Sequence, residues 1–415
     1  MAESTSRIIE VIHDCRLCNS RSLEHSFALP ETPLANDFRP LLEKKHTYDR
    51  YPLELLRCTT CSHVQLRHVV DPVSLFSNYA YVSGTSATFV NHFKNYASWI
   101  QKDLRLDPTS KILEIGSNDG TLLKFLKTFG YQCIGIDPAA NIVNDIDTDD
   151  IELICSFFDR SIAASIKEKY GELDLIVANN VFAHIWKLRD AISEASELLR
   201  ADGYLVFEVS YLLDVIEKCL FDTIYHEHLD YHSLTALTPF LESLGLTVID
   251  AIRVNTHGGS IRIVAQKNKT TSSTSARVID LLNAERAIGI GTGQGLENLN
   301  QRIGVLASRG NSLLNNLRTS NARIVGFGAP AKMTTLVYTF GITHGVFDYI
   351  VDDSALKQYT LAPGGHSPIY PSNHLYKERP DYIVILAWNF ASAISASHQE
   401  FAGRFIVPVP EISFL

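Results

Sequence analysis

The chain has 415 residues, 46% of them hydrophobic and 20% charged, and a formal net charge of −9. This composition is that of an ordinary globular protein, and the length predicts two or three domains because it exceeds a single core. The acidic balance argues against binding to a phosphate backbone, so we expect no nucleic acid partner.

The sequence also carries no membrane or export signal that we can identify. No uninterrupted apolar run reaches about 18 residues, so we expect no membrane span and no membrane partner. Residues 1–7 lack the apolar core of a signal peptide. We therefore expect a cytoplasmic protein.

Two pairs of cysteines predict a metal-binding module at the start of the chain. Cys15 and Cys18 form one Cys-x-x-Cys pair, and Cys58 and Cys61 form another. Each pair can place two thiolates on one metal ion, and in a cytosolic chain such pairs favour zinc over disulfides. Four sulfurs leave no open coordination position, so we predict a structural Zn²⁺. Redox-active pairs or free thiols are the alternative.

A helix over residues 86–104 is expected next, followed by a strand, a glycine turn, a helix and a second strand. The apolar run 112–115 predicts a buried strand, the turn spans 116–120, and an amphipathic helix begins at Thr121. The second strand ends at Asp137, about 20 positions after the turn begins. Glycines let the backbone approach a ligand, and a carboxylate at the next strand tip can hold both ribose hydroxyls. This order predicts a site for an adenosine cofactor.

The residues of the turn distinguish between adenosine cofactors. A dinucleotide fingerprint has glycine where this chain has Asn118, and Glu114 inside the strand would repel a pyrophosphate. A carboxylate there suits a cationic amino acid tail. The pattern Glu-x-Gly-x-x-x-Gly resembles the first motif of class I S-adenosylmethionine methyltransferases, and residues 173–180 and 201–208 resemble their fourth and fifth strands. The alternative is an ordinary doubly wound sheet with an incidental glycine turn.

A cluster of ionisable groups follows the fifth predicted strand, in residues 225–232. General acid–base catalysis by one histidine is the favoured interpretation, because the pKa of histidine lies near working pH. A catalytic metal held by His226, His228 and His232 is one alternative, although only the last two have helical i, i+4 spacing and the matching acid is missing. A structural hydrogen-bond network is the other.

A polar stretch over 267–275 marks a boundary, after which helices are expected at 276–288 and 296–317. A second α/β unit then begins with a strand and glycine turn at 323–332, which could accept phosphate through backbone N–H groups and Lys332. The predicted fold class is α/β. We expect a zinc-binding domain (1–78), a class I methyltransferase Rossmann-like domain (79–268) and a second Rossmann-like domain (269–415).

These motifs, taken in order with Thr256–Arg262, resemble one family along essentially the whole chain. It comprises the S-adenosylmethionine-dependent C-methyltransferases that act on nucleotide-linked 4-keto-deoxysugars. The resemblance implies His228 as the base, with Tyr225 and Glu227 beside it and a tyrosine from the segment holding Tyr79 and Tyr81. Cofactor contacts are expected from Glu114, Gly116, Ser117, Asn118, Asp119, Gly120, Asp137, Pro138, Asn179 and Asn180. The resemblance also implies that the domain 269–415 binds the nucleotide sugar. It implies substrate contacts from His184, His257, Gly258, Ser260, Arg262, Ala329, Lys332, Lys357, Trp388 and Asn389.

The chemistry implied is methylation of a ring carbon, C3, next to the ketone of a 4-keto-6-deoxysugar linked to dTDP or GDP. A base must first remove the carbon-bound proton to give an enolate, and nearby donors must stabilise the oxyanion. We expect a monomer that uses S-adenosylmethionine and works in deoxysugar biosynthesis. An O- or N-methyltransferase and a non-enzymatic sensor of two nucleotides are the competing hypotheses.

Overall fold

The central sheet of the computed structural model has the order β13-β14-β11-β10-β7-β8-β9. The five strands from β11 to β9 are parallel, whereas β14 runs antiparallel to both β11 and β13. The structure describes residues 9–42, 48–76, 82–85, 87–143, 151–268, 274–343, 345–365, 367–401 and 403–415. The strands of this sheet are β7 (Lys111–Ile115), β8 (Gln132–Asp137), β9 (Glu152–Cys155), β10 (Leu173–Asn179), β11 (Leu199–Ser210), β13 (Leu246–Val254) and β14 (Ser260–Lys267).

Helices cover both faces of the central sheet because its parallel strands are apolar on both sides. The helix predicted at 86–104 runs as α2 (Ala87–Trp99) and a π-helical turn (Ile100–Leu104), and it buries the aromatic side chains Phe89, Phe93 and Tyr96. The other helices of this lobe are α3 (Thr121–Lys127), α4 (Ala140–Val143), α5 (Arg160–Tyr170), α6 (Leu188–Leu198), α7 (Leu212–Lys218) and α8 (Leu234–Glu242). In the part of the chain that is described, no helix is long and apolar enough to span a membrane.

A smaller antiparallel sheet, of order β12-β5-β4-β2, carries the four predicted zinc ligands at one end. Its strands are β2 (Leu23–Thr32), β4 (Tyr51–Cys58), β5 (Val64–Leu66) and β12 (Asp230–Tyr231). Because β12 comes from the middle of the chain, this sheet incorporates part of the 225–232 segment. Two short ladders complete the region: β1 (Ile9–Val11) with β6 (His68–Val70), and β3 (Arg39–Pro40) with β17 (Thr360–Leu361). The helix α1 (Pro72–Phe76) and the 3₁₀ turn η1 (Ser83–Thr85) follow.

The C-terminal sheet has the order β18-β16-β15-β19-β20-β21. Adjacent strands in it are parallel, except that β21 is antiparallel to β20. Its strands are β15 (Ile324–Phe327), β16 (Ile350–Val351), β18 (Ile369–Tyr370), β19 (Tyr382–Ile385), β20 (Arg404–Val407) and β21 (Ser413–Phe414). The helices are α9 (Ala276–Ile288), α10 (Gln294–Thr319), α11 (Lys332–Thr339), α12 (His374–Glu378) and α13 (Ala391–Ser397). The helix bounds 276–288 are as predicted, and α10 extends two residues beyond each predicted end.

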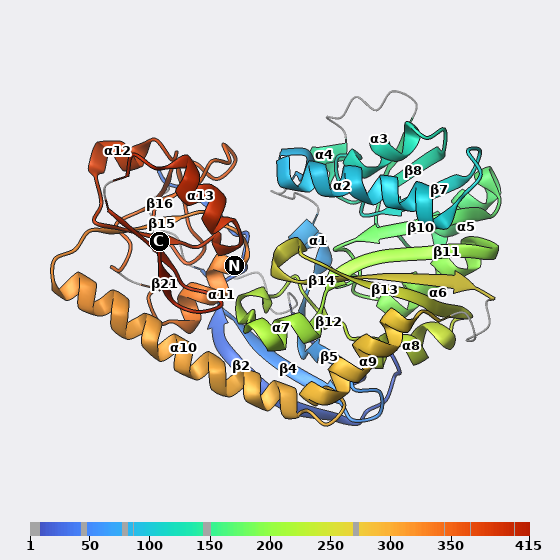
Figure 1. Ribbon diagram of the computed structural model, residues 1–415, viewed down its shortest axis with the longest axis horizontal. Helices are drawn as coiled ribbons and strands as arrows, with labels where there is room; N and C mark the ends of the chain where they lie inside the picture. Colours follow the sequence, from blue (N-terminus) through green and yellow to red (C-terminus); the bar gives the residue numbers. More distant parts are fainter. Residues whose placement is uncertain are drawn as a thin grey trace, which may run out of the picture.

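Figure 1 shows how these parts are arranged. The central sheet and the C-terminal sheet form two lobes, and the strands β2 and β4 run from one lobe to the other beneath the space between them. The strand β2 contacts both α10 and α11 of the C-terminal lobe. The N-terminal sheet therefore bridges the two α/β lobes.

Candidate active site

A cavity of about 1680 Å³ is lined by the carboxyl ends of both parallel sheets. Gly116, Asp137 and Asn179 border it from the central sheet, and Gly328 and Asp352 border it from the C-terminal sheet. Ligands of open parallel sheets bind at this edge of the strands. The two sheets thus share one binding space, which is larger than the pocket of a typical small ligand.

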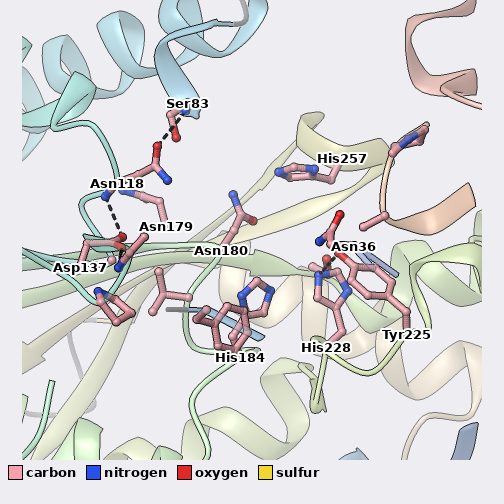
Figure 2. A pocket seen from close by; sticks show the side chains of 18 of the residues that line it. Asn36, Ser83, Asn118, Asp137, Asn179, Asn180, His184, Tyr225, His228 and His257 are labelled. Carbon is pink, nitrogen blue, oxygen red and sulfur yellow. Dashed lines mark hydrogen bonds between the residues drawn. The ribbon is translucent and has the colours of Figure 1, made fainter. Parts of the chain in front are cut away.

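Asp137, the carboxylate predicted to bind the cofactor, lies at the end of β8 and lines the cavity (Figure 2). Its Oδ2 accepts a hydrogen bond from the backbone N–H of Asn118 at 2.9 Å, and its Oδ1 accepts one from Ala139 at 2.9 Å. Burial raises the pKa of this carboxyl, which the two N–H donors counteract. Each carboxylate oxygen can accept a second hydrogen bond, so Asp137 can still receive ribose hydroxyls.

The side-chain amide of Asn179 is held by a hydrogen bond to the buried acid Glu114. Its Nδ2 donates to Oε1 of Glu114 at 3.2 Å, and among the described residues neither Oδ1 of Asn179 nor Oε2 of Glu114 has a hydrogen-bond partner. Burial raises the pKa of Glu114 well above its usual value. The unpaired Oδ1 of Asn179, which lines the cavity, suits a ligand that donates a hydrogen bond, and such a ligand would satisfy it.

The turn after β7 brings the backbone close to its neighbour. Gly116 has φ +70°, and a Cβ added there would lie 2.2 Å from Cγ2 of Val181. Together with the unpaired Oδ1 of Asn179, this close approach fits the S-adenosylmethionine predicted for the turn. The cavity lining, as far as the chain is described, contains Gly116, Asn118, Asp137, Pro138, Asn179 and Asn180 of the predicted cofactor residues, but not Glu114, Ser117, Asp119 or Gly120. Asp119 instead accepts hydrogen bonds from Gly84 N–H and the Thr121 hydroxyl, and so shapes the start of α3.

His228 borders the cavity and is held at both ring nitrogens. Its Nδ1 lies 2.8 Å from the carbonyl oxygen of Thr223, which can only accept, so Nδ1 carries the proton. Nε2 is therefore the acceptor for the Tyr225 hydroxyl, also at 2.8 Å. Burial lowers the pKa of His228 to about 4 and raises the pKa of Tyr225 well above its usual value. The pair, whose positions Figure 2 shows, is thus a neutral imidazole with a proton-free Nε2 and a protonated phenol.

His184 lies next to this pair, with its ring stacked on that of His228 at a centroid distance of 5.1 Å. In the described residues its buried Nε2 has no hydrogen-bond partner. Both His184 and His228 line the cavity. His184 therefore lies at the cavity beside His228, and its contact with a substrate stays a prediction.

The other members of the 225–232 cluster point elsewhere. His226 hydrogen-bonds the carbonyl of Tyr51, and His232 lies 3.4 Å from the carbonyl of Phe182. Burial lowers the pKa of each of these histidines to about 4. Glu227 accepts a hydrogen bond from Nδ2 of Asn36 at 2.6 Å, and Asn36, which the sequence did not indicate, lines the cavity.

Asp230 connects the cluster to the cysteine pairs. It accepts hydrogen bonds from Nε of Arg16 at 2.8 Å and from Nε2 of His63 at 2.8 Å. Arg16 lies inside the first Cys-x-x-Cys pair and His63 follows the second by two positions. Burial raises the pKa of Asp230, but the charge of Arg16 together with the hydrogen bond and charge of His63 lowers it to about 2. This connection could not be predicted from the sequence, because Asp230 and its partners are more than 160 residues apart.

The four predicted metal ligands converge. The Sγ atoms of Cys15, Cys18, Cys58 and Cys61 all lie within 4.8 Å of one another. Cys15 and Cys61 are 3.6 Å apart, and Cys18 and Cys58 are 3.5 Å apart. These separations are close to the ~3.8 Å between sulfurs in a tetrahedral site with Zn–S bonds of about 2.3 Å. The donor set therefore fits the structural zinc that was predicted.

The cavity carries a positive charge on its C-terminal side. Nζ of Lys332 donates to Oδ1 of Asn389 at 2.8 Å and lies 3.8 Å from the centroid of the Trp388 ring. Burial lowers the pKa of Lys332 to about 8, so the amine is still mostly charged at pH 7. Lys357 lies beside the same glycine turn and donates to the carbonyl of Ala329 at 3.0 Å. Lys332, Lys357 and Asn389 line the cavity.

The remaining predicted substrate residues are divided between the cavity and the core. His257 lines the cavity, and burial together with the charge of Lys332 lowers its pKa to about 3. Arg262 lies in a buried ion pair, with Nε 2.8 Å from Oε1 of Glu208, and Ser260 is also buried. In the described chain neither of these two, nor Gly258, Ala329 or Trp388, is part of the cavity lining. Tyr79 and Tyr81 lie outside the described residues.

The central sheet, with its antiparallel β14 between β11 and β13 and its glycine turn at the carboxyl edge, defines a class I S-adenosylmethionine methyltransferase. Three family models match the chain: a zinc binding domain (residues 15–76), a methyltransferase domain (90–251) and a C-methyltransferase C-terminal domain (255–410). The C-methyltransferase NovU of Streptomyces niveus is 30% identical over 407 residues, which cover 97% of each chain. The chain therefore belongs to this family of S-adenosylmethionine-dependent C-methyltransferases.

Solved structures resemble a smaller part of the chain. The carbon methyltransferase CurJ is 17% identical, with coverage of 48% of this chain and 62% of its own and a TM-score of 0.36. Magnesium protoporphyrin IX methyltransferase (ChlM) from Synechocystis PCC 6803, solved with bound SAM, is 14% identical, with coverage of 43% and 79% and a TM-score of 0.33. The family assignment depends on the sequence matches alone.

Proposed function

We propose that this C-methyltransferase methylates C3 of a 4-keto-6-deoxysugar linked to dTDP or GDP, in deoxysugar biosynthesis. The observation that carries the proposal is the Tyr225–His228–Thr223 arrangement in a cavity that two Rossmann-like sheets share. Carbon methylation needs a base for a carbon-bound proton, and a ketone beside that carbon makes the proton removable.

His228 is the proposed base. Its Nε2 takes the proton from C3, the C–H electron pair moves into the ring, and the ketone becomes an enolate. The carbonyl of Thr223 holds the Nδ1–H and stabilises the imidazolium that forms. Bound S-adenosylmethionine supplies an electrophilic methyl group for the resulting carbon nucleophile. No metal ion is required for this proton transfer.

Tyr225 is the proposed donor to the developing oxyanion. Its hydroxyl hydrogen rotates about the C–O bond, so it can leave Nε2 of His228 and donate to the substrate oxygen. This single rotation frees the base and stabilises the enolate together. Asn36 orients Glu227 through its hydrogen bond, and His184 offers an unpaired nitrogen to the sugar.

The cofactor end of the cavity is assigned on the same basis. Asp137 is proposed to hold the ribose hydroxyls, and Asn179, oriented by Glu114, to accept from the ammonium group of the methionine part. The Asp137→Ala variant should therefore bind S-adenosylhomocysteine about 10- to 100-fold more weakly, the range for lost hydrogen bonds to a charged group.

Product analysis tests the proposed reaction. The chain is incubated with S-adenosylmethionine carrying a ¹³C methyl group and with GDP- or dTDP-linked 4-keto-6-deoxyglucose, and the product is examined by NMR. The expected product shows the labelled methyl bonded to a ring carbon next to the ketone. A methyl signal bonded to oxygen or nitrogen, or no transfer to either sugar nucleotide, would contradict the proposal.

A further inference from the structure

The glycine turn of the C-terminal sheet repeats the construction of the cofactor turn. Gly116 N–H donates to the carbonyl of Ile136 at 2.7 Å, and Gly328 N–H donates to the carbonyl of Val351 at 2.7 Å. Both glycines have positive φ, +70° and +85°. In each case the glycine follows the first strand of a parallel sheet, and the acceptor carbonyl is in the next parallel strand.

The correspondence extends to the strand on the other side of each first strand, β10 beside β7 and β19 beside β15. A Cβ on Gly116 would lie 2.2 Å from Val181, and one on Gly328 would lie 2.5 Å from Ala387. Val181 and Ala387 each stand two positions beyond the end of their strands, β10 and β19. The two turns therefore present their backbones to the cavity in the same way.

A carboxylate occupies the same place beside each turn. Asp352 follows Val351 as Asp137 follows Ile136, and it accepts from Ala329 N–H at 2.6 Å and from Ser354 N–H at 2.8 Å. Asp137 accepts in the same manner from a turn residue and from the residue two positions after itself. Asp352 also lines the cavity, and one further acceptor position remains on each of its oxygens.

The surroundings of Asp352 differ from those of Asp137 by a cation. Nζ of Lys357 is 3.9 Å from Oδ2 of Asp352 and donates to the carbonyl of Ala329. Lys332 lies on the other side of the same turn, at the start of α11. An acid at the strand tip with two cations along the turn is a chemistry suited to a nucleoside diphosphate: hydroxyl groups for the acid and phosphates for the amines.

We infer that Asp352 accepts the ribose hydroxyls of the nucleotide part of the substrate, as Asp137 is proposed to do for the cofactor. The ligand class is a nucleoside diphosphate whose 3′-hydroxyl is free, with the 2′-hydroxyl of a ribonucleotide as a second donor. The inference rests on the proposed function, because it assigns the C-terminal side of the cavity to the sugar nucleotide. The cavity then holds a nucleoside at the carboxyl end of each sheet.

The test measures binding by calorimetry with GDP, dTDP and their 3′-deoxy analogues, and with S-adenosylhomocysteine. For whichever diphosphate binds the unmodified chain, loss of the 3′-hydroxyl should weaken binding about 10- to 100-fold. In the Asp352→Asn variant, loss of the 3′-hydroxyl should lower the affinity for the diphosphate only a few fold. The reason is that a neutral amide accepts a weaker hydrogen bond than a carboxylate does. The matched variant Asp137→Asn should weaken S-adenosylhomocysteine and leave the diphosphate unchanged.

Each outcome decides the assignment. Equal affinity of the unmodified chain for a diphosphate and its 3′-deoxy analogue would overturn it, even if Asp352→Asn does not fold. The assignment would also be overturned if the Asp352→Asn variant bound S-adenosylhomocysteine more weakly by the same factor as it bound the diphosphate. If neither GDP nor dTDP bound the unmodified chain, the sugar nucleotide proposal itself would fail, and this assignment with it.

Discussion

His228 differs from the other histidines of its segment in what its two nitrogens contact. Thr223 fixes the proton on Nδ1, and Tyr225 meets Nε2 at the surface of the cavity. His226 and His232 contact backbone carbonyls away from that surface. Tautomer and access together make His228 the base that the reaction needs.

Replacing Tyr225 with Phe should lower kcat by about 10²–10³-fold, because it removes one donor to a developing oxyanion. The KM should change far less, since the hydroxyl hydrogen bonds His228 before substrate arrives. Steady-state kinetics measures both. Tyr349→Phe is the matched control: this hydroxyl is buried without a partner in the described chain and its residue is not part of the cavity lining. A Tyr225→Phe enzyme with unchanged kcat would remove Tyr225 from the mechanism.

At the scale of elements, the cysteine pairs and the His228 segment form one unit. Asp230 in β12 pairs opposite Gln65 in β5, and its carboxylate is held by Arg16 and His63. The carbonyl of Leu229, the residue after His228, accepts from Leu66 N–H at 2.9 Å. Backbone and side-chain bonds from the zinc-binding module thus position the base.

Asp230→Asn should lower kcat and the melting temperature while zinc stays bound. Removing one partner of a buried ion pair leaves Arg16 uncompensated, at a cost of about 3–5 kcal/mol in the free energy of unfolding. Asp14→Asn serves as the control, because its ion pair with Arg21 on the same module is exposed and contributes about 0–1 kcal/mol. Thermal unfolding, metal analysis and kinetics provide the measurements. Full activity in Asp230→Asn would show that the base needs no such support.

The purified chain should carry one zinc ion, and Cys58→Ser should release it and lower the melting temperature sharply. Binding energy at a structural zinc site is also folding energy, because the unfolded chain has no preformed site. Elemental analysis and calorimetric unfolding measure both effects. Cys155→Ser, an exposed cysteine away from the cluster, should retain metal and stability. Metal-free protein prepared without chelators would contradict the zinc assignment.

Local patterns predicted most of these elements. The glycine turn, the strand ending at Asp137, α9 and the four cysteines follow from apolar periodicity and spacing within short windows. The structure agrees because these features depend mainly on nearby residues.

Contacts between segments that are distant along the chain could not be predicted from the sequence. The pairing of β12 with β5 and the Asn36–Glu227 hydrogen bond depend on tertiary packing. The same reason applies to Arg262, whose ion pair with Glu208 places it in the core. Spacing along the chain cannot show which face of a loop meets a cavity.

At the scale of the whole molecule, neutral histidines are buried in the 225–232 segment, which joins the N-terminal sheet through β12. Burial lowers the pKa of His226, His228 and His232 to about 4 each, below the ~6.5 of an unfolded chain. The unfolded state therefore binds more protons between these values, and stability present above pH 6.5 is lost as the pH falls toward 4. Asp230, with a pKa of about 2, adds a further loss below pH 4.

Unfolding by denaturant, measured from pH 7.5 down to pH 4.5, should show a steady fall in the free energy of unfolding below about pH 6.5. The slope reports proton uptake on unfolding and should approach one proton per buried histidine. His232→Asn, which removes one such group outside the cavity, should reduce the slope. Stability that stays constant from pH 7 to pH 5 would contradict the neutral, buried state of these histidines.

The central claim, that His228 removes a carbon-bound proton, is tested most directly by solvent exchange. The chain is incubated in D₂O with GDP- or dTDP-linked 4-keto-6-deoxyglucose, without S-adenosylmethionine, and deuterium at C3 is followed by NMR. The unmodified chain should introduce deuterium, because proton removal precedes methyl transfer. His228→Asn should bind both ligands yet lose exchange and turnover by about 10²–10⁴-fold, the usual contribution of a positioned base. Undiminished exchange in His228→Asn would contradict the account and assign the base to another residue.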